Sequence, residues 1–168
     1  GQPFVAIGTD SNLLPQPVTV QSVRIGPAER VDVVIDFTNY QNNSEVFLVN
    51  RLQQTDGRKP DGLVSPGTSI LKFLVDGVVP APDPSQVPAT LLPVTEGPAQ
   101  LLPEVKVQRR IKADRSNGAW TINGQFFDEN RISARPRRGE PEIWILESGG
   151  GWVHPVHIHL SEFFILSR

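Results

Sequence analysis

The sequence predicts an all-β protein, built as a β-sandwich or a β-barrel. Short runs of apolar and β-branched residues recur at close spacing, and turns rich in glycine and proline separate them. No stretch of 11 or more residues holds a helical period, so the sequence predicts no long amphipathic helix. Both observations are typical of sheets assembled from many short strands.

The first part of the chain contains five candidate strands. An apolar run at 4–7 is followed by a turn-forming segment at 8–12. The segment 31–37 shows the clearest alternation, because its apolar residues fall on every second position and would share one face. Further strands are predicted at 18–25, 46–52 and 70–75, with polar loops at 39–44 and 53–67.

A proline-rich segment divides the chain. Seven prolines lie between Pro80 and Pro103, and proline cannot donate a hydrogen bond to a sheet ladder. Such a segment should run extended over the surface as a linker. We therefore predict part of one domain at 1–79, an interdomain linker at 80–103 and part of a second domain at 104–168.

The second domain begins with strands predicted at 105–111, 120–124 and 142–147. Asn123-Gly124 is a strong signal for a tight turn. The glycines at 149–151 provide a flexible corner, and an alternating strand at 154–160 follows directly. The last residues, 162–168, look like an apolar strand that stops as it finishes, so we expect the chain to be a fragment of a longer protein.

Composition excludes several classes of site and partner. The chain has no Cys, which excludes disulfides, Cys-zinc sites and thiol nucleophiles within it. The formal net charge is −2 and acidic residues interleave with the Lys and Arg clusters, so we expect no nucleic-acid partner. No apolar run approaches the ~20 residues that a membrane-spanning helix needs.

All three histidines of the chain lie close together, at His154, His157 and His159. Side chains two residues apart share a face of a strand, so His157 and His159 should point the same way. Pro155 fixes the local backbone and directs His154 elsewhere. Neutral imidazole is the commonest protein ligand for a transition metal, and this clustering favours a metal site over histidines that are merely buried or solvated.

The histidine segment resembles a known family. His154-Pro-Val-His-Ile-His-Leu160, continued by Phe163 and 165–168, is similar to the H-P-x-H-x-H-L motif of the last cupredoxin domain in multicopper oxidases. The segments at 7–18 and 26–37 resemble the middle domain of that family, and those at 120–128 and 142–144 resemble the opening of the last domain. The likeness is closest to the bacterial bilirubin oxidase and spore-coat laccase branch. It implies two partial cupredoxin-like Greek-key β-sandwiches.

The resemblance also implies the cofactor and the role of each histidine. In the family the three motif histidines ligate, in order, the type 1, type 2 and type 3 coppers, which assigns His154, His157 and His159 to these sites. A blue type 1 site also needs a Cys thiolate and a second His, and the family's trinuclear cluster uses eight histidines. This chain supplies only part of each set, so we expect it to be inactive alone and to be completed by the rest of the same protein or by companion chains.

The resemblance implies that the whole protein oxidises phenolic or similar small substrates in one-electron steps and reduces dioxygen to water. It also implies an extracytoplasmic or spore-coat location. Two alternatives stay open: a non-catalytic cupredoxin-fold module and a cupin-like mononuclear metal enzyme. Gly151, five residues and then His157-x-His159 match the start of a cupin signature, but Glu162 comes one residue too early and no glycine follows.

Overall fold

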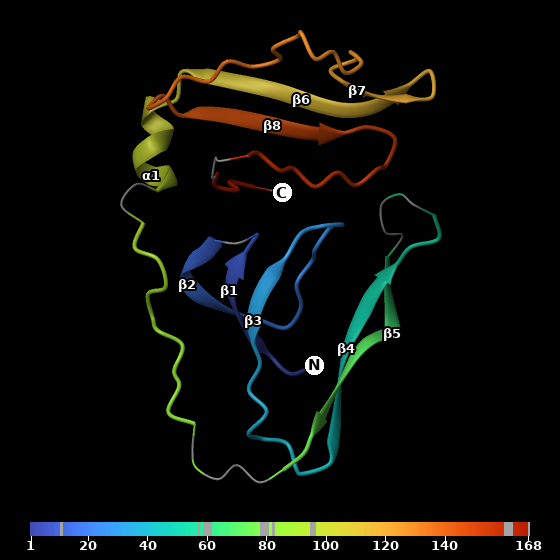
Figure 1. The fold of residues 1–168 in the computed structure, drawn as a ribbon, viewed down its shortest axis with the longest axis vertical. Coiled ribbons are helices and arrows are strands. Elements are labelled where there is room, and N and C mark those ends of the chain that lie inside the picture. The colour runs from blue at the N-terminus through green and yellow to red at the C-terminus, as the bar shows by residue number, and fades with distance from the viewer. Residues whose placement is uncertain are drawn as a thin grey trace. The chain divides into compact units, whose positions relative to one another are not determined.

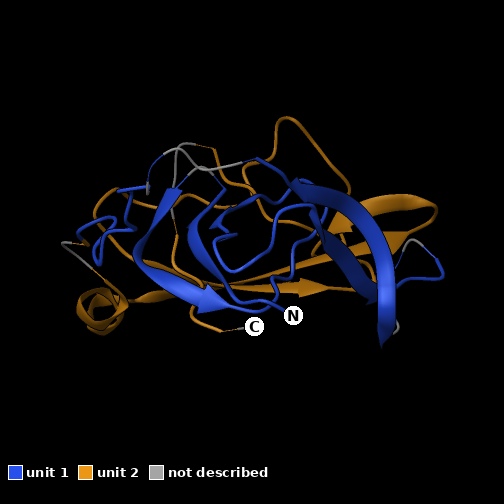
Figure 2. Cartoon of the chain, turned by 90° about the horizontal axis from the view of Figure 1, so that it is seen from below, with its two compact units in different colours: residues 1–93 blue, residues 94–168 orange. Residues whose placement is uncertain are grey.

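The computed structural model describes residues 1–10, 12–56, 58, 62–77, 81, 83–94, 97–159 and 163–167. The chain forms two compact units, residues 1–93 and 94–168, which Figure 2 shows in different colours. The division falls inside the predicted 80–103 linker, whose own bounds stay a prediction. The described helical structure is limited to two short pieces, α1 (Pro98–Leu101) and the 3-10 helix η1 (Leu102–Glu104), so the all-β prediction is confirmed.

These helical pieces correct the expectation that the linker is extended throughout. Pro98 occupies the first turn of α1, where its missing N–H costs nothing and its fixed φ suits a helix. The side-chain carbonyl of Gln100 accepts a hydrogen bond from the backbone N–H of Gly97, 3.0 Å away, which closes the helix start. Earlier in the same segment, the backbone N–H of Leu91 donates to the carbonyl of Pro15 at 3.0 Å.

Unit 1 contains two antiparallel sheets (Figure 1). The first has the strand order β2-β1-β3, and the second is the ribbon β4-β5. The strands are β1 (Phe4–Thr9), β2 (Asn12–Val20), β3 (Val31–Val34), β4 (Ser44–Gln53) and β5 (Gly62–Val75).

Three of these strands differ from the predicted ranges. The strand predicted at 18–25 lies instead at 12–20 and contains Pro15 and Pro17, which an edge strand tolerates because one side of it forms no ladder. β3 ends before 37 because the carboxylate of Asp36 accepts the N–H of Thr38 at 2.8 Å and turns the chain. β5 begins inside the predicted 53–67 loop, because its first residues extend the ladder with β4.

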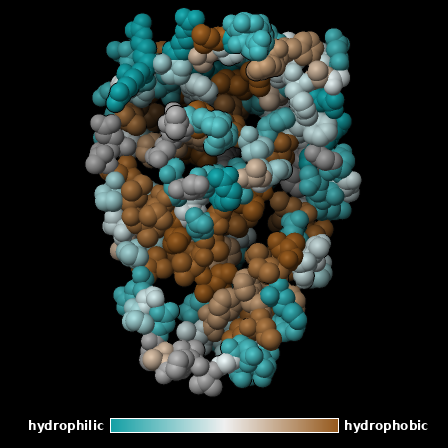
Figure 3. Space-filling view, viewed as in Figure 1, coloured by the Kyte–Doolittle hydropathy of each residue, from teal (hydrophilic) through white to brown (hydrophobic). Residues whose placement is uncertain are grey.

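Little of unit 1 is buried. Ala6 in β1, at 6% exposed, is the only large or small apolar side chain among the described residues that is buried, and none is completely inaccessible. Large apolar side chains on the β4-β5 ribbon stay open to solvent, including Leu71 at 50% and Leu74 at 57%. Figure 3 shows apolar surface, in brown, gathered over the β2-β1-β3 region. Such contiguous apolar exposure indicates sheets that lack their packing partners.

Unit 2 contains one three-stranded sheet with the order β7-β6-β8. Its strands are β6 (Val107–Ser116), β7 (Ala119–Ile122) and β8 (Glu142–Ser148). β6 pairs antiparallel with β7 and parallel with β8, and residues 123–141 make the crossover that a parallel pair requires. The predicted tight turn at Asn123-Gly124 is confirmed, since both residues have positive φ, 52° and 76°.

The segment 154–160 is the main correction to the sequence prediction. Residues 152–158 form no strand, and Leu160, Glu162 and Arg168 lie outside the described residues. A strand is defined by ladder hydrogen bonds to a neighbour, and the described residues offer this segment no such neighbour. The chain reaches it through a corner in which Gly150 and Gly151 adopt positive φ, 65° and 75°, as the glycine run predicted.

Candidate metal centre

The glycine corner after β8 determines where the histidines begin. The backbone N–H of Gly149 donates to the carbonyl of Ala113 on β6 at 2.7 Å, which extends the ladder by one bond. The N–H of Trp152 donates to the carbonyl of Gly149 at 3.4 Å, and the Ser148 hydroxyl donates to the carbonyl of Trp152. These bonds turn the chain back across the end of the sheet before His154.

His154 is half-buried and packs against an aromatic side chain of the neighbouring strand. Its imidazole lies 4.8 Å, centroid to centroid, from the indole of Trp120 on β7, with the two planes at 89°. The Nε2 atom is buried and has no hydrogen-bond partner among the described residues. Buried polar atoms in proteins are normally hydrogen-bonded or bound to a metal. A metal ion or an ordered water is therefore a suitable partner for this nitrogen.

A cavity of about 550 Å³ adjoins this imidazole within unit 2. The indoles of Trp120 and Trp152 line it together with Ile122, and Arg131 lines it from the crossover. The Nε atom of Arg131 is also buried without a hydrogen-bond partner among the described residues, although another nitrogen of the same guanidinium donates to the carbonyl of Phe126. Thr121, Gln125, Asp128 and Ser133 line it as well, so the cavity combines aromatic and polar side chains and has two buried nitrogen atoms at its wall.

His157 and His159 form a separate pair. Their rings lie 4.8 Å apart, centroid to centroid, at 77°, and both side chains are exposed. The structure thus brings together the two histidines that the sequence placed on one face, although the strand that motivated this prediction is not formed. His154 contacts Trp120 instead. The three imidazoles therefore form two groups, His154 on its own and the His157-His159 pair.

The residues fit a partial, shared role in binding copper. The described part of the chain holds no cluster of three or more His, Asp or Glu side chains arranged for a metal ion. Two adjacent exposed imidazoles and one half-buried imidazole with an unpartnered nitrogen are nevertheless suitable donors for transition metals. A complete copper site would therefore need ligands beyond those that the described residues bring together.

The aromatic surroundings of His154 were missed from the sequence. Trp120 lies 34 residues before His154, and no periodic pattern links the two positions. The guanidinium of Arg115 lies over the Trp120 ring, 5.2 Å from its centroid, and Trp152 meets the same indole at 5.4 Å and 84°. Asn117 and Gly118, which both have positive φ, form the hairpin turn between β6 and β7. This turn brings Arg115 and Trp120 opposite each other. This second Asn-Gly pair was the one available signal.

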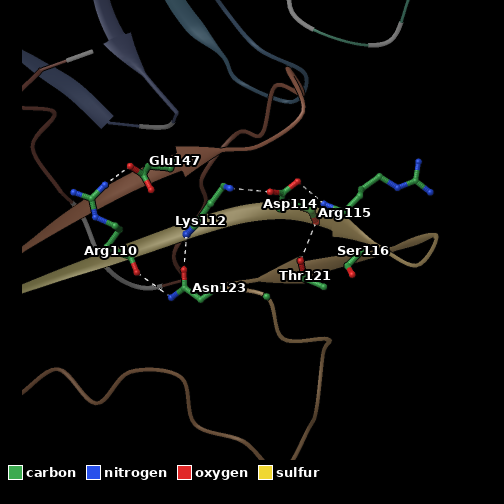
Figure 4. A pocket seen from close by; sticks show the side chains of 9 residues that line it. Arg110, Lys112, Asp114, Arg115, Ser116, Thr121, Asn123 and Glu147 are labelled. Atoms are coloured by element: carbon green, nitrogen blue, oxygen red, sulfur yellow. Dashed lines mark hydrogen bonds and ion pairs between the residues drawn. The ribbon is translucent and has the colours of Figure 1, made fainter.

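A charged groove of about 490 Å³ on the same sheet is a weaker candidate site (Figure 4). Lys112 Nζ lies 2.9 Å from the Asp114 carboxylate, and Arg110 pairs with Glu147 across the parallel strands. The hydrogen bond to Asp114 raises the pKa of Lys112, and the same bond lowers the pKa of Asp114. Because these four charges compensate one another in solvent, the groove is a solvated, ion-paired surface.

Comparison with known proteins gives consistent relatives. A sequence model of the family described as multicopper oxidase matches residues 100–168. Bilirubin oxidase from Albifimbria verrucaria is 35% identical over 169 residues, which cover 99% of this chain and 29% of that protein. A laccase from Bacillus subtilis is 29% identical, covering 100% and 32%. Cell division protein FtsP from Xenorhabdus nematophila is 30% identical, covering 99% and 34%.

Solved structures show the same fold. A crystal structure of laccase from Pediococcus acidilactici matches with a TM-score of 0.62 at 23% identity, covering 91% of this chain and 30% of that one. This likeness confirms the cupredoxin-like, all-β fold class expected from the sequence. The chain spans about a third of the length of the curated relatives named above.

Proposed function

We propose that this chain, which belongs to the multicopper oxidase family, is part of a longer protein that acts as a copper-dependent oxidase of the laccase or bilirubin oxidase kind. On this proposal, His154 is a ligand of the type 1 copper, His157 of the type 2 copper and His159 of a type 3 copper. Bound copper supplies the one-electron chemistry that oxidises a phenolic or similar substrate and passes the electrons to dioxygen.

The division of the three histidines supports this assignment most directly. His154 packs on Trp120 beside a cavity of aromatic and polar side chains and keeps a buried nitrogen without a hydrogen-bond partner among the described residues. His157 and His159 face each other at 4.8 Å on an exposed stretch. One ligand for a separate mononuclear copper and two for neighbouring coppers of one cluster account for this arrangement, whereas a single mononuclear site would need all three rings to converge.

The partners and location follow from the same proposal. The remaining ligands come from other segments of the same polypeptide, because the curated relatives are longer single chains that this chain covers only in part. A small reducing substrate and dioxygen are the reactants on this proposal, and the family resemblance implies an extracytoplasmic or spore-coat location. Among the described residues, no helix is both long and apolar enough to cross a membrane.

Single replacements in the full-length protein test the assignment. We expect His154→Ala to remove the blue absorption of the type 1 copper while leaving the trinuclear coppers largely bound. We expect His157→Ala and His159→Ala to keep the blue colour and to lose dioxygen reduction. Metal analysis, visible absorption and oxygen uptake on the same preparations separate these outcomes. If all three replacements emptied one and the same site, a cupin-like mononuclear centre would become the better interpretation.

A non-catalytic cupredoxin-fold module is the second candidate function. The likeness to a protein named cell division protein FtsP favours it, because that relative matches 99% of this chain at 30% identity. The two proposals differ in whether the full-length protein contains the missing Cys and His ligands. Copper content after reconstitution of the full-length protein distinguishes them: an oxidase binds several coppers per chain, and a non-catalytic module lacking the ligands binds none stoichiometrically.

A further inference from the structure

We propose that Trp120 is a positioning residue for His154, whose imidazole plane it holds in the orientation needed for the type 1 copper. The inference rests on the proposed function and extends it to a residue outside the histidine motif. It concerns the indole ring and its two supports, Arg115 and Trp152, all within unit 2.

The backbone around His154 does little to fix its side chain. Residues 152–158 make no ladder in the described chain, so no strand geometry determines the direction of the imidazole. The outer torsion of a histidine side chain is broad and intrinsically allows many ring orientations. The Nε2 atom has no hydrogen-bond partner among the described residues, so that atom does not restrain the ring through a hydrogen bond. Packing against a neighbour is the restraint that remains.

Trp120 provides a fixed surface for this packing. It lies on β7, directly paired with Arg115 on β6, and its own ring is held from two directions. The Arg115 guanidinium lies 5.2 Å from the ring centroid, an attractive cation–π contact, and donates a hydrogen bond of 2.8 Å to the carbonyl of Gly118. Trp152 meets the indole edge-on at 5.4 Å. Although 47% of Trp120 stays exposed, these contacts restrain its plane.

The contact geometry between the two rings allows the indole of Trp120 to determine the orientation of the His154 imidazole. The imidazole and indole planes stand at 89° with centroids 4.8 Å apart, an edge-to-face contact that aromatic quadrupoles favour. Rotating the imidazole about its outer torsion would replace this contact with a steric clash or a gap. Groups that touch a ligand without binding the metal commonly determine its orientation and tune the site. Trp120 therefore acts on the metal through His154.

The first test uses the metal-free full-length protein, so it does not depend on copper binding. Diethyl pyrocarbonate modifies accessible imidazoles, and mass spectrometry of peptides gives the rate at each histidine. We expect Trp120→Ala to raise the rate at His154 several-fold without changing the rates at His157 and His159. Trp120→Phe, which keeps a ring at the position, should restore the slow rate. Trp144→Phe is the matched control, because that indole on β8 donates instead to Glu142.

The second test uses the copper-loaded protein. We expect Trp120→Ala to weaken and shift the blue absorption band and to alter the copper hyperfine splitting in electron paramagnetic resonance, with Trp120→Phe close to wild type. If Trp120→Ala does not fold, Arg115→Ala removes the support and keeps the ring, and a smaller rise in the His154 modification rate is expected. The proposal is overturned if neither variant changes the His154 rate or the blue spectrum relative to Trp144→Phe. A wild-type protein without a blue band refutes the proposed function, whereas the modification rates still decide the role of Trp120.

Discussion

Glu142 illustrates how a single residue fastens the parallel strand pair of unit 2. Its carboxylate accepts two hydrogen bonds from the Arg109 guanidinium, at 2.7 and 2.8 Å, and a third from the Trp144 indole at 2.9 Å. The Glu142 side chain is only 9% exposed. The Arg109 hydrogen bond, followed by that of Trp144, lowers the pKa of Glu142 from 4.5 to about 2. Glu142 stands opposite Val107 at the start of the ladder between β6 and β8, and Arg109 stands opposite Trp144.

This depressed pKa predicts a defined loss of stability in acid. The folded-state pKa lies below the unfolded value, so the contribution is fully present above pH 4.5 and is lost as the pH falls toward about 2. We expect the difference in unfolding free energy between wild type and Glu142→Gln, in the full-length protein, to shrink across this window and to be constant above it. Chemical denaturation at a series of pH values measures it. Glu45→Gln, at an exposed carboxylate paired with Lys72, is the control.

Gly149 carries a second residue-scale prediction. A Cβ added there would lie 2.3 to 2.5 Å from all three atoms of the Asp114 carboxyl group, so Gly149→Ala should displace that carboxylate from Lys112. Because the clash is with the end of a side chain that can move aside, we expect a cost below the ~1–3 kcal/mol that overpacking a core typically causes. Thermal unfolding of the full-length protein should show a lowered midpoint for the alanine variant.

The double variant Gly149→Ala with Asp114→Ala is the control for this mechanism. Removing the carboxylate removes the clash, so the double variant should be more stable than the sum of the two single changes predicts. Strict additivity of the two changes would mean that the glycine is required for another reason, such as its place in the corner before Gly150.

At the scale of the strands, residue alternation and turn-forming residues predicted that a strand exists better than they predicted where it begins and ends. β4, β6, β7 and β8 lie close to their predicted positions. β2 was displaced because the sequence does not reveal which strand is an edge strand, and only an edge strand accommodates Pro15 and Pro17. The histidine segment was wrong as a strand because ladder formation depends on a partner that the described residues do not include.

The close contact at Gly8 gives a prediction at this scale. The register of β1 shifts between Ala6 and Gly8 against both of its neighbours, which marks a β-bulge. A Cβ at Gly8 would meet the backbone carbonyl of Asn12 at 2.9 Å and the Asp32 carboxylate at 2.8 Å. Backbone atoms of the neighbouring strand cannot rotate away as a side chain can. The sheet must therefore shift to accept any larger residue.

We expect Gly8→Ala to lower the unfolding free energy of the full-length protein by about 1–3 kcal/mol, as overpacking typically does. Denaturant titration gives the value. Gly62→Ala is the matched control, because a Cβ at Gly62, at the start of β5, meets no atom within 4 Å. Equal stability of the two variants would show that the bulge has room for a methyl group.

For the whole molecule, the sequence motif was more informative about the metal site than about its surroundings. The clustering of the three histidines could be predicted because it is a property of the sequence itself, whereas the pairing of His157 with His159 was predicted from a strand that the described residues do not form. The contact between Trp120 and His154 could not be predicted, because it depends on how β7 and the glycine corner meet in space. The absence of Cys and the presence of only three His could be stated from the sequence alone, since composition needs no fold.

The exposed surface of the chain leads to the last prediction. The described chain has an accessible surface of 13689 Å², whereas two separate folded domains that share its 18.5 kDa would expose about 9,900 Å². Exposed apolar side chains such as Leu71 and Leu74 contribute to this excess, and unpaired strand edges add to it.

We therefore expect residues 1–168, expressed alone, to associate or aggregate and to unfold without a cooperative transition, while the full-length protein unfolds cooperatively. Analytical ultracentrifugation and calorimetry measure both properties, and supplying the remaining segments of the protein in trans should shift the chain into a soluble complex. A monomeric 168-residue chain with a sharp unfolding transition would contradict this expectation. Such behaviour requires a buried apolar core, and the exposure of the apolar side chains shows none among the described residues.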